Sequence, residues 1–274
     1  MTQFTDYFSA LSLLRSAFRD LEGVFDKLNP RQPLTRTRLV AVSSDLECIS
    51  ELCGKSFLEC AIWSLHAAER QLEVEENAPV LSTQEMLELQ DYQIRENNNG
   101  KPLAASEKVR RDELAARSQR FTEELLAAFK RDEDCGVDKE LKKAEVILKA
   151  NVRAFLFSCR SYQDAIYALF LISKGKQPGQ HSSMAKGVEK SEFQGAIADL
   201  PNYKDWFTRI RDLRNLSKVG ATCSVGLGIS DVKVRYDDAR NDRWVKVGGN
   251  DFSFSDLSQS IEMSARITKL VVGS

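Results

Sequence analysis

The sequence predicts a mainly α-helical protein, a multi-helix bundle with one small inserted antiparallel β-hairpin. Over most of the 274 residues, apolar side chains recur every three or four positions, which is the spacing of a helix with one buried face. The spacing changes to alternation near residues 232–236, which is typical of a strand. Hydrophobic residues make up 42% of the chain and charged residues 29%, a composition that supports a buried core.

Residues 1–132 are expected to form an N-terminal helical region, either an interaction module or a family-specific extension. Apolar residues lie on one helical face from Phe4 to Leu28, and the two prolines of NPRQP, residues 29–33, end that helix. A second apolar stripe predicts a helix from about residue 35 to residue 75. The two segments are expected to form an antiparallel helical pair.

Two further helices are expected before residue 132. Ser82 and Glu85 have the Ser-x-x-Glu spacing of a capping box, in which each side chain accepts a hydrogen bond from the other residue's backbone N–H. The helix that begins there should end at NNNGKP, residues 97–102, because asparagine and glycine favour left-handed turns and proline stops a helix. A thin apolar line in a highly charged stretch predicts the next helix over residues 106–132.

Residues 137–271 are expected to form a second helical bundle. Its central helix carries a continuous apolar stripe made of Leu148, Val152, Phe155, Cys159, Tyr162, Ile166 and Leu169. A loop rich in glycine, serine and lysine follows at residues 173–187, then a short helix at 189–199 and a longer one over 201–218.

A β-hairpin is expected at about residues 229–247. Apolar and polar residues alternate from Val232 to Tyr236, the polar turn DDARND follows, and residues 244–247 are the expected returning strand. Residues 252–254 are a candidate extension of this hairpin. A final helix is expected over residues 255–271, with an inward face of Leu257, Ile261, Ser264, Ile267 and Val271.

The net charge of −1 hides two segments of opposite sign. The segment from Glu69 to Glu96 carries eight acidic residues against two arginines, a local net charge of −6. From Lys174 to Lys218 there are nine basic and five acidic residues, a local net charge of +4. An anionic ligand is therefore expected in the second segment, although the two segments are also able to attract each other.

The cysteine and histidine content predicts no metal site and no cofactor. Six cysteines in a chain of this size, several of them at apolar helical positions, are expected to be free thiols of a reducing compartment. No CxxC pair occurs, and His66 and His181 are far apart in the sequence. The chain also lacks the glycine-rich and HExxH motifs of the commonest sequence-readable enzymes.

A cytoplasmic protein without membrane attachment is expected. The N-terminus MTQFTDYFSALSLL has neither a basic region nor a small-residue cleavage site, so it does not read as a signal peptide. No apolar stretch approaches the ~18 residues that a membrane-spanning helix needs.

One combination of segments resembles a known family. A long helix with FLFSCRSYQDAIYALF, a variable loop, and a helix ending in WFTRIRDLRNLSKV are similar to the HEPN superfamily of four-helix bundles. These proteins are common in bacterial toxins, defence systems and RNA processing, and many are metal-independent ribonucleases with an RNxxxH motif. Arg214 and Asn215 match the first two positions, and Val219 occupies the histidine position. The resemblance covers roughly residues 137–271 and implies a homodimer in which two motifs face one cleft.

The missing histidine has a chemical consequence. Cutting RNA without a metal requires one group to take the 2′-hydroxyl proton and another to protonate the leaving oxygen. An imidazole suits either task and valine neither, while a lysine ammonium such as that of Lys218, with an ordinary pKa of about 10.4, is a poor base. No catalytic residue is therefore predicted. The expected function is non-catalytic binding of RNA, a nucleotide or a protein partner, in a bacterial defence or toxin–antitoxin setting.

The predicted nucleic-acid or anion site lies near the end of the helix over 201–218. Its residues are Arg211, Arg214, Asn215 and Lys218. The three cations fall within one sector of the helix, and Arg214 is able to offer a bidentate fork to a phosphate. The lysines of the preceding loop, Lys174, Lys176, Lys186 and Lys190, are expected to add positive potential.

Three alternatives stay open at this point. The same cations are explained without a ligand if Arg211 pairs with Asp205 or Asp212 and the helix dipole favours positive charge near its C-terminus. A metal-independent ribonuclease would use Arg214 with a displaced acid–base group, either Lys218 or His181. A purely structural helical assembly protein would show no affinity for nucleic acid at any salt concentration.

Overall fold

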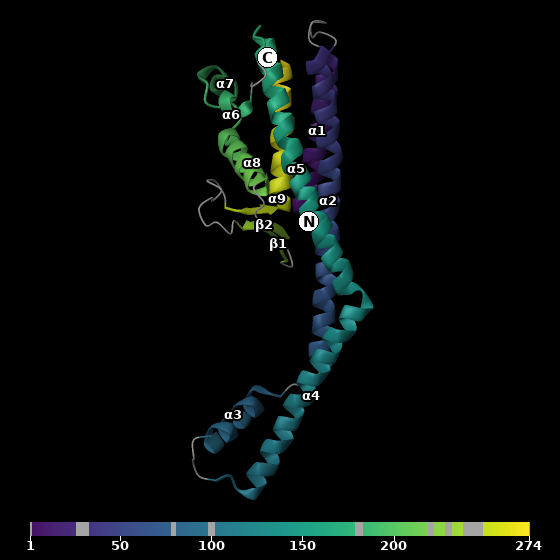
Figure 1. Ribbon diagram of the computed structural model, residues 1–274, viewed down its shortest axis with the longest axis vertical. Coiled ribbons are helices and arrows are strands. Elements are labelled where there is room, and N and C mark those ends of the chain that lie inside the picture. Colours follow the sequence, from purple (N-terminus) through teal and green to yellow (C-terminus); the bar gives the residue numbers. More distant parts are fainter. Residues whose placement is uncertain are drawn as a thin grey trace. The chain divides into compact units, whose positions relative to one another are not determined.

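The fold is mainly helical, as the sequence predicts. A computed structural model of the chain describes residues 2–25, 33–77, 81–97, 102–178, 183–218, 222–227, 232–237 and 249–273. Within these residues the chain forms nine helices and one three-stranded antiparallel sheet (Figure 1). No helix in this part of the chain is long and apolar enough to cross a membrane.

The elements follow one another in a simple order. The helices are α1 (Thr2–Phe25), α2 (Pro33–Asn77), α3 (Thr83–Asn97), α4 (Ala105–Cys135), α5 (Val137–Ser173), α6 (Met184–Gly187), α7 (Ser191–Ala196), α8 (Tyr203–Lys218) and α9 (Phe254–Gly273). The strands are β1 (Thr222–Gly226), β2 (Lys233–Asp237) and β3 (Asp251–Ser253).

The chain forms two compact units. The first contains Met1–Ile62 and Lys143–Ser274, and the second contains Trp63–Lys142. The sequence predicts one boundary, at residues 132–137, between an N-terminal and a C-terminal region. The first compact unit instead contains α1 and the first part of α2 together with the C-terminal helices. The physical reason is that α1 packs along α9, with the rings of Tyr7 and Phe254 5.1 Å apart.

The core of the first unit is centred on α5. All seven residues of the stripe expected on this helix are buried, and so are all five residues of the inward face expected on α9. Polar groups on α9 also have partners in this core. The indole Nε1 of Trp206 on α8 donates a hydrogen bond to Ser260 Oγ at 3.0 Å, which fixes the rotation of α8 against α9.

The sheet differs in its pairing from the expected hairpin. Its order is β1-β2-β3, so β2 is central, with Val234 opposite Val225 on one side and Phe252 on the other. The partner strand expected at residues 244–247 lies outside the described residues. The third strand, β3, overlaps the candidate extension at 252–254 but begins one residue earlier, and Phe254 is already the first residue of α9. Figure 1 shows β1 and β2 at the lower end of α8.

A capping box fixes the point where the sheet turns into α9. The backbone N–H of Ser253 donates to Asp256 Oδ2 at 2.8 Å, and the backbone N–H of Asp256 donates to Ser253 Oγ at 3.2 Å. Asp256 also pairs with Arg209 of α8 at 3.0 Å, so the start of α9 is tied to α8.

The second unit has a small core of its own between α3 and α4. Its buried side chains are Leu81, Leu89, Tyr92, Leu103 and Leu114. The capping box predicted at Ser82 and Glu85 is confirmed, because the Glu85 N–H donates to Ser82 Oγ at 3.2 Å and the Ser82 N–H donates to Glu85 Oε2 at 2.9 Å. This backbone hydrogen bond, together with the Arg117 guanidinium, lowers the pKa of Glu85 to about 2.

The two units carry opposite net charge. Between Trp63 and Lys142 there are 18 acidic and 12 basic residues, whereas the rest of the chain has 22 acidic and 27 basic ones. An anionic ligand is therefore favoured by long-range electrostatics only in the first unit.

Candidate anion-binding site

The site is built on α8, whose start is set by a tight turn. Asn202 has a positive φ of 64°, a backbone conformation that asparagine tolerates better than most residues, and its carbonyl accepts the Trp206 N–H at 2.9 Å. From there α8 runs for 16 residues. Its buried side chains are Tyr203, Trp206, Phe207, Ile210, Leu213, Leu216 and Ser217.

Arg214 of α8 is held against α5. Its guanidinium carbon lies 5.0 Å from the centroid of the Phe157 ring, and its Nη1 donates a hydrogen bond to Asn215 Oδ1 at 3.3 Å. The Arg214 Nε is buried and has no hydrogen-bond partner. Among the described residues, no acidic side chain forms an ion pair with Arg214. Within the described part of the chain, its charge is therefore held in place without a carboxylate partner.

The other residues of the predicted site are placed differently. Arg211 is half-buried and pairs with Asp212, with 3.1 Å between Nε and Oδ1, which is one of the ion pairs considered for it. Asn215 is exposed and contacts Arg214 through its side-chain oxygen. Lys218 is exposed and is the last residue of α8. Arg214 thus forms a hydrogen bond with Asn215, whereas Arg211 forms an ion pair with Asp212.

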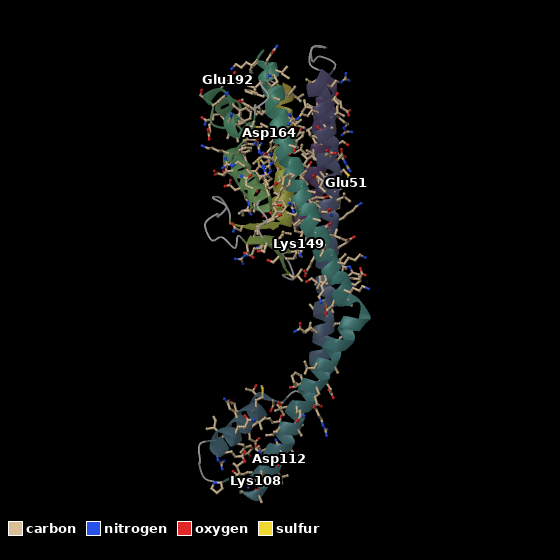
Figure 2. All side chains as sticks on the ribbon, viewed as in Figure 1. Glu51, Lys108, Asp112, Lys149, Asp164 and Glu192 are labelled. Carbon is tan, nitrogen blue, oxygen red and sulfur yellow. The ribbon has the colours of Figure 1, made fainter. Side chains whose placement is uncertain are left out.

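A second arginine, Arg160 of α5, belongs to the same site. It is only 8% exposed, its guanidinium carbon lies 5.1 Å from the centroid of the Phe207 ring on α8, and its Nη1 lies 2.7 Å from Asp164 Oδ1. This short contact pairs a buried guanidinium with a partly exposed carboxylate. Figure 2 labels Asp164 in the upper part of α5.

The two arginines act on each other electrostatically. Burial lowers the pKa of Arg160, the ion pair with Asp164 opposes that shift, and the positive charge of Arg214 lowers the pKa further. The helices α5 and α8 each supply one arginine and one phenylalanine, and each arginine lies over the phenylalanine of the other helix. Cation–π contacts of this kind contribute roughly 0.5–2 kcal/mol each, which helps to hold two like charges close together.

Asp164 ties this pair to the segment that precedes α8. Its Oδ1 accepts a hydrogen bond from the backbone N–H of Met184, at 2.8 Å, where α6 begins. The same oxygen faces Arg160. The carboxylate therefore joins α5 to the α6 backbone and sets the position of the Arg160 guanidinium.

Tyr203, at the start of α8, lies within electrostatic reach of Arg160 and has an unpaired hydroxyl. The residue is 1% exposed, packs on Trp206 with ring centroids 5.3 Å apart, and has no hydrogen-bond partner for its hydroxyl. Burial raises the pKa of Tyr203, while the positive charge of Arg160 acts in the opposite direction. A phenol with a raised pKa stays protonated at neutral pH, so its O–H is available to donate a hydrogen bond.

The loop lysines contribute less positive potential than expected. Lys176 pairs with Glu192 of α7, which Figure 2 labels, and the Lys174 ammonium lies 5.7 Å from the Phe170 ring centroid. Lys186 and Lys190 are exposed. Of these four lysines, Lys176 is therefore paired with an acidic residue, Glu192, of the same positively charged segment.

The remaining candidates do not join the site. His66 lies on α2 in the second unit, 3.5 Å from Glu69, while His181 and Val219 lie outside the described residues. The five cysteines that the structure describes in full are not paired in disulfides; they are Cys48, Cys53, Cys60, Cys159 and Cys223. Within the described part of the chain, no group of three potential ligands is placed to hold a metal ion.

The candidate site has an excess of positive charge. Four cations, Arg160, Arg211, Arg214 and Lys218, accompany two carboxylates, Asp164 and Asp212, so the six groups carry a net charge of +2. Guanidinium groups donate strong, directional hydrogen bonds to phosphate oxygens.

Comparison with known proteins adds no relative to this picture. No protein-family model, curated protein or solved structure matches the chain.

Proposed function

We propose that this chain is a non-catalytic RNA-binding or nucleotide-binding protein that holds phosphate at the edge of α8. The binding residues are Arg211, Arg214, Asn215 and Lys218, together with Arg160 from α5. The observation that carries the proposal is the arginine pair: two guanidinium groups lie within electrostatic reach of each other, and Asp164 is the one carboxylate that the described residues pair with either of them.

Phosphate is the ligand that this arrangement favours. Holding like charges together raises the free energy of the unliganded protein, and an anion between them removes that repulsion. Arg214 is already oriented by Phe157 and Asn215, so little side-chain entropy remains to be lost on binding. Such preorganised arginines are typical of phosphate recognition.

The biological setting is proposed on the resemblance alone. The helices α5 and α8 carry the segments that resemble the HEPN superfamily, and the proposal includes a HEPN-like bundle, a homodimer whose two copies of Arg214 face one cleft, and a role in bacterial defence. A protein partner in place of RNA would use the same cationic edge.

The proposal is tested by titrating a fluorescein-labelled single-stranded RNA with the purified protein at several salt concentrations. We expect the affinity to fall as salt rises, because phosphate contacts release counterions. Arg214→Ala should weaken binding by about tenfold or more, the effect expected for one charged hydrogen bond. Arg211→Ala combined with Lys218→Ala should weaken binding and flatten the salt dependence.

A matched control is Arg266→Ala, which removes an exposed arginine of α9 that pairs with Glu262. This variant should bind RNA like the unmodified chain. Absence of RNA binding even at low salt, or equal affinity of Arg214→Ala and the unmodified chain, would overturn the proposal. Gel electrophoresis of the same samples tests the ribonuclease alternative. That alternative predicts that the unmodified chain cuts the RNA into fragments and that Arg214→Ala does not.

A further inference from the structure

We infer that the strand β1 is the dimer interface of this chain, where it pairs antiparallel with β1 of a second copy. The inference rests on the homodimer of the proposed function and names the surface that forms it. Ser224 of one copy lies opposite Ser224 of the other, so the three-stranded sheets of the two copies join into one continuous sheet.

The strand β1 lies at an edge of the described sheet (Figure 1). The strand order is β1-β2-β3, and among the residues that the structure describes, β2 is the only strand that pairs with β1. An edge strand presents a row of unpaired backbone N–H and C=O groups, which are able to bind another strand. The outer edge of β1 is therefore a surface that a further strand fits.

The ladder shows which backbone groups of β1 point to this edge. The Tyr236 N–H of β2 donates a hydrogen bond at 3.0 Å to the carbonyl of the residue that precedes β3, so Tyr236 faces β3. Backbone groups alternate in direction along an antiparallel strand, so Arg235 faces β1, where it lies opposite Ser224. The residues on either side of Ser224, which are Cys223 and Val225, therefore point their N–H and C=O groups outward.

A second copy of β1 satisfies these outward groups with an identical strand. In the antiparallel register centred on Ser224, Cys223 of each copy lies opposite Val225 of the other. The two residues of each such pair exchange both N–H···O bonds. This register uses the full length of β1, Thr222–Gly226, whereas a shift by one residue would place inward side chains opposite outward ones.

Side chains on the inner face of the sheet favour the same register. Val234 and Phe252 are both 0% exposed in the middle of the sheet, whereas Val225, in the same row, is only half-buried at its edge. In the dimer, Val225 packs beside Cys223 of the second copy. The apolar row of each sheet thus continues into the other sheet, which removes apolar surface from water.

Side chains on the outer face are complementary in charge. The strand β1 itself has no charged residue and no proline, the features that commonly keep an edge strand from pairing. Within one sheet, Lys233 lies opposite Gly226 and Asp237 lies opposite Thr222. The dimer register joins these two rows, so Lys233 shares a row with Asp237 of the second copy, with only small side chains between them. This attraction favours a second copy as the partner.

The dimer also brings the two α8 helices to one side of the joined sheet. A two-fold axis perpendicular to the sheet keeps its two faces distinct, so α8, which contacts β2, lies on the same face in both copies. Lys218, the last residue of α8, precedes Thr222 by four positions, which span at most about 14 Å. The interface therefore adjoins the cationic end of α8 in each copy.

A cysteine at the centre of the interface tests the register. Opposite residues of a non-hydrogen-bonded antiparallel pair have Cα atoms about 4.5 Å apart, which is within the range of a disulfide. Ser224→Cys should therefore give a disulfide-linked dimer on a non-reducing gel after the purified protein is oxidised with diamide. Thr222→Cys is the matched control, because it is exposed on the same strand but lies opposite Gly226 of the second copy. This variant should give no more dimer than the unmodified chain.

Charges at Ser224 test the interface in solution. Two short strands make a small interface, so sedimentation velocity should show a dimer of the unmodified chain that dissociates on dilution. Ser224→Lys and Ser224→Glu each place like charges opposite each other and should weaken dimerisation by at least about tenfold. An equal mixture of the two variants should restore the dimer, because a lysine then meets a glutamate. Restoration would also show that both variants fold.

The outcomes separate this inference from the proposed function. If the chain forms a dimer that Ser224→Cys does not cross-link, or that both charge variants leave intact, the inference is wrong while the homodimer stands. Cross-linking of Thr222→Cys in place of Ser224→Cys would contradict the register and with it the inference. If the chain stays monomeric at every concentration, the inference and the homodimer both fail, and the edge of β1 belongs to another strand. RNA binding by Arg214 is decided separately by its own titration.

Discussion

Arg214 of α8 lies over the ring of Phe157 on α5, with 5.0 Å between the guanidinium carbon and the ring centroid. The opposite contact, Arg160 of α5 over Phe207 of α8, has nearly the same geometry at 5.1 Å. These two reciprocal contacts between α5 and α8 keep two positive charges close together. Among the described residues, Arg214 has no acidic partner.

Removing the ring beneath Arg214 should weaken RNA binding without unfolding the protein. In Phe157→Ala the guanidinium loses its cation–π contact and much of its preorganisation, so we expect a loss of affinity of about three- to tenfold. Fluorescence anisotropy with single-stranded RNA measures this change. Phe8→Ala, which truncates a 60% exposed phenylalanine on α1, should leave the affinity unchanged. Equal losses in the two variants would mean that the ring does not act through Arg214.

Neutralising Asp164 should destabilise the first unit. Asp164→Asn leaves the buried Arg160 charge without its carboxylate, and because Asp164 is itself 24% exposed we expect a loss of about 2 kcal/mol, below the value for a fully buried pair. Urea unfolding followed by tryptophan fluorescence measures the loss. The control Glu262→Gln breaks an exposed pair with Arg266 and should change the free energy of unfolding by less than about 0.5 kcal/mol. Similar values for both variants would contradict a special role for the Arg160–Asp164 pair.

A close approach between α1 and α2 depends on Gly54. A Cβ atom at this position would lie 2.3 Å from the Tyr7 hydroxyl oxygen, which donates a hydrogen bond to the Ser50 carbonyl at 3.0 Å. Gly54→Ala should therefore destabilise the protein by about 2 kcal/mol through overpacking. Gly23→Ala, on α1 with open space around it, should instead stabilise the helix by about 0.5–1 kcal/mol. Thermal unfolding of both variants checks the opposite signs, and a stabilised Gly54→Ala would show that the helices do not meet there.

The start of α3 should weaken in acid. The pKa of Glu85 is lowered in the folded protein from an ordinary value of 4.5 to about 2, so its contribution to stability is present above pH 4.5 and is lost as the pH falls toward 2. Amide hydrogen-exchange protection factors in α3, corrected for intrinsic exchange, should fall across this window. Glu85→Gln should remove that dependence. Glu123→Gln is the control, because Glu123 accepts its hydrogen bond from a neutral partner, Gln119. Unchanged pH dependence in Glu85→Gln would assign the effect to other carboxyls.

The helices could be predicted from the sequence because their apolar spacing is regular. The stripe on α5, the inward face of α9 and the capping box at Ser82 are all confirmed, since each depends on residues three or four positions apart. The position of α1 could not be predicted, because packing against α9 joins residues more than 200 positions apart and leaves no local signal. The pairing of β1 with β2 was missed for a related reason, since Thr222–Gly226 is short and carries small residues.

The candidate site was only partly predictable. Arg214 and Asn215 could be proposed because they form a short motif on one helix. Arg160 was missed because its role depends on contacts with Phe207 and Asp164 that the linear order does not show. The available signal was a single arginine inside the apolar segment FLFSCRSYQD, followed four residues later by an aspartate. A charged residue in a buried helical segment is rare unless it is paired or functional.

The most direct test of the arginine pair is a nuclear magnetic resonance titration of the side-chain Nε–Hε signals of arginine, assigned by substitution. On addition of a single-stranded RNA, we predict that the signals of Arg160 and Arg214 shift together and saturate at the same ligand concentration. The signal of Arg266, on the exposed part of α9, should stay in place. RNA binding that leaves the Arg160 and Arg214 signals unmoved would contradict the account.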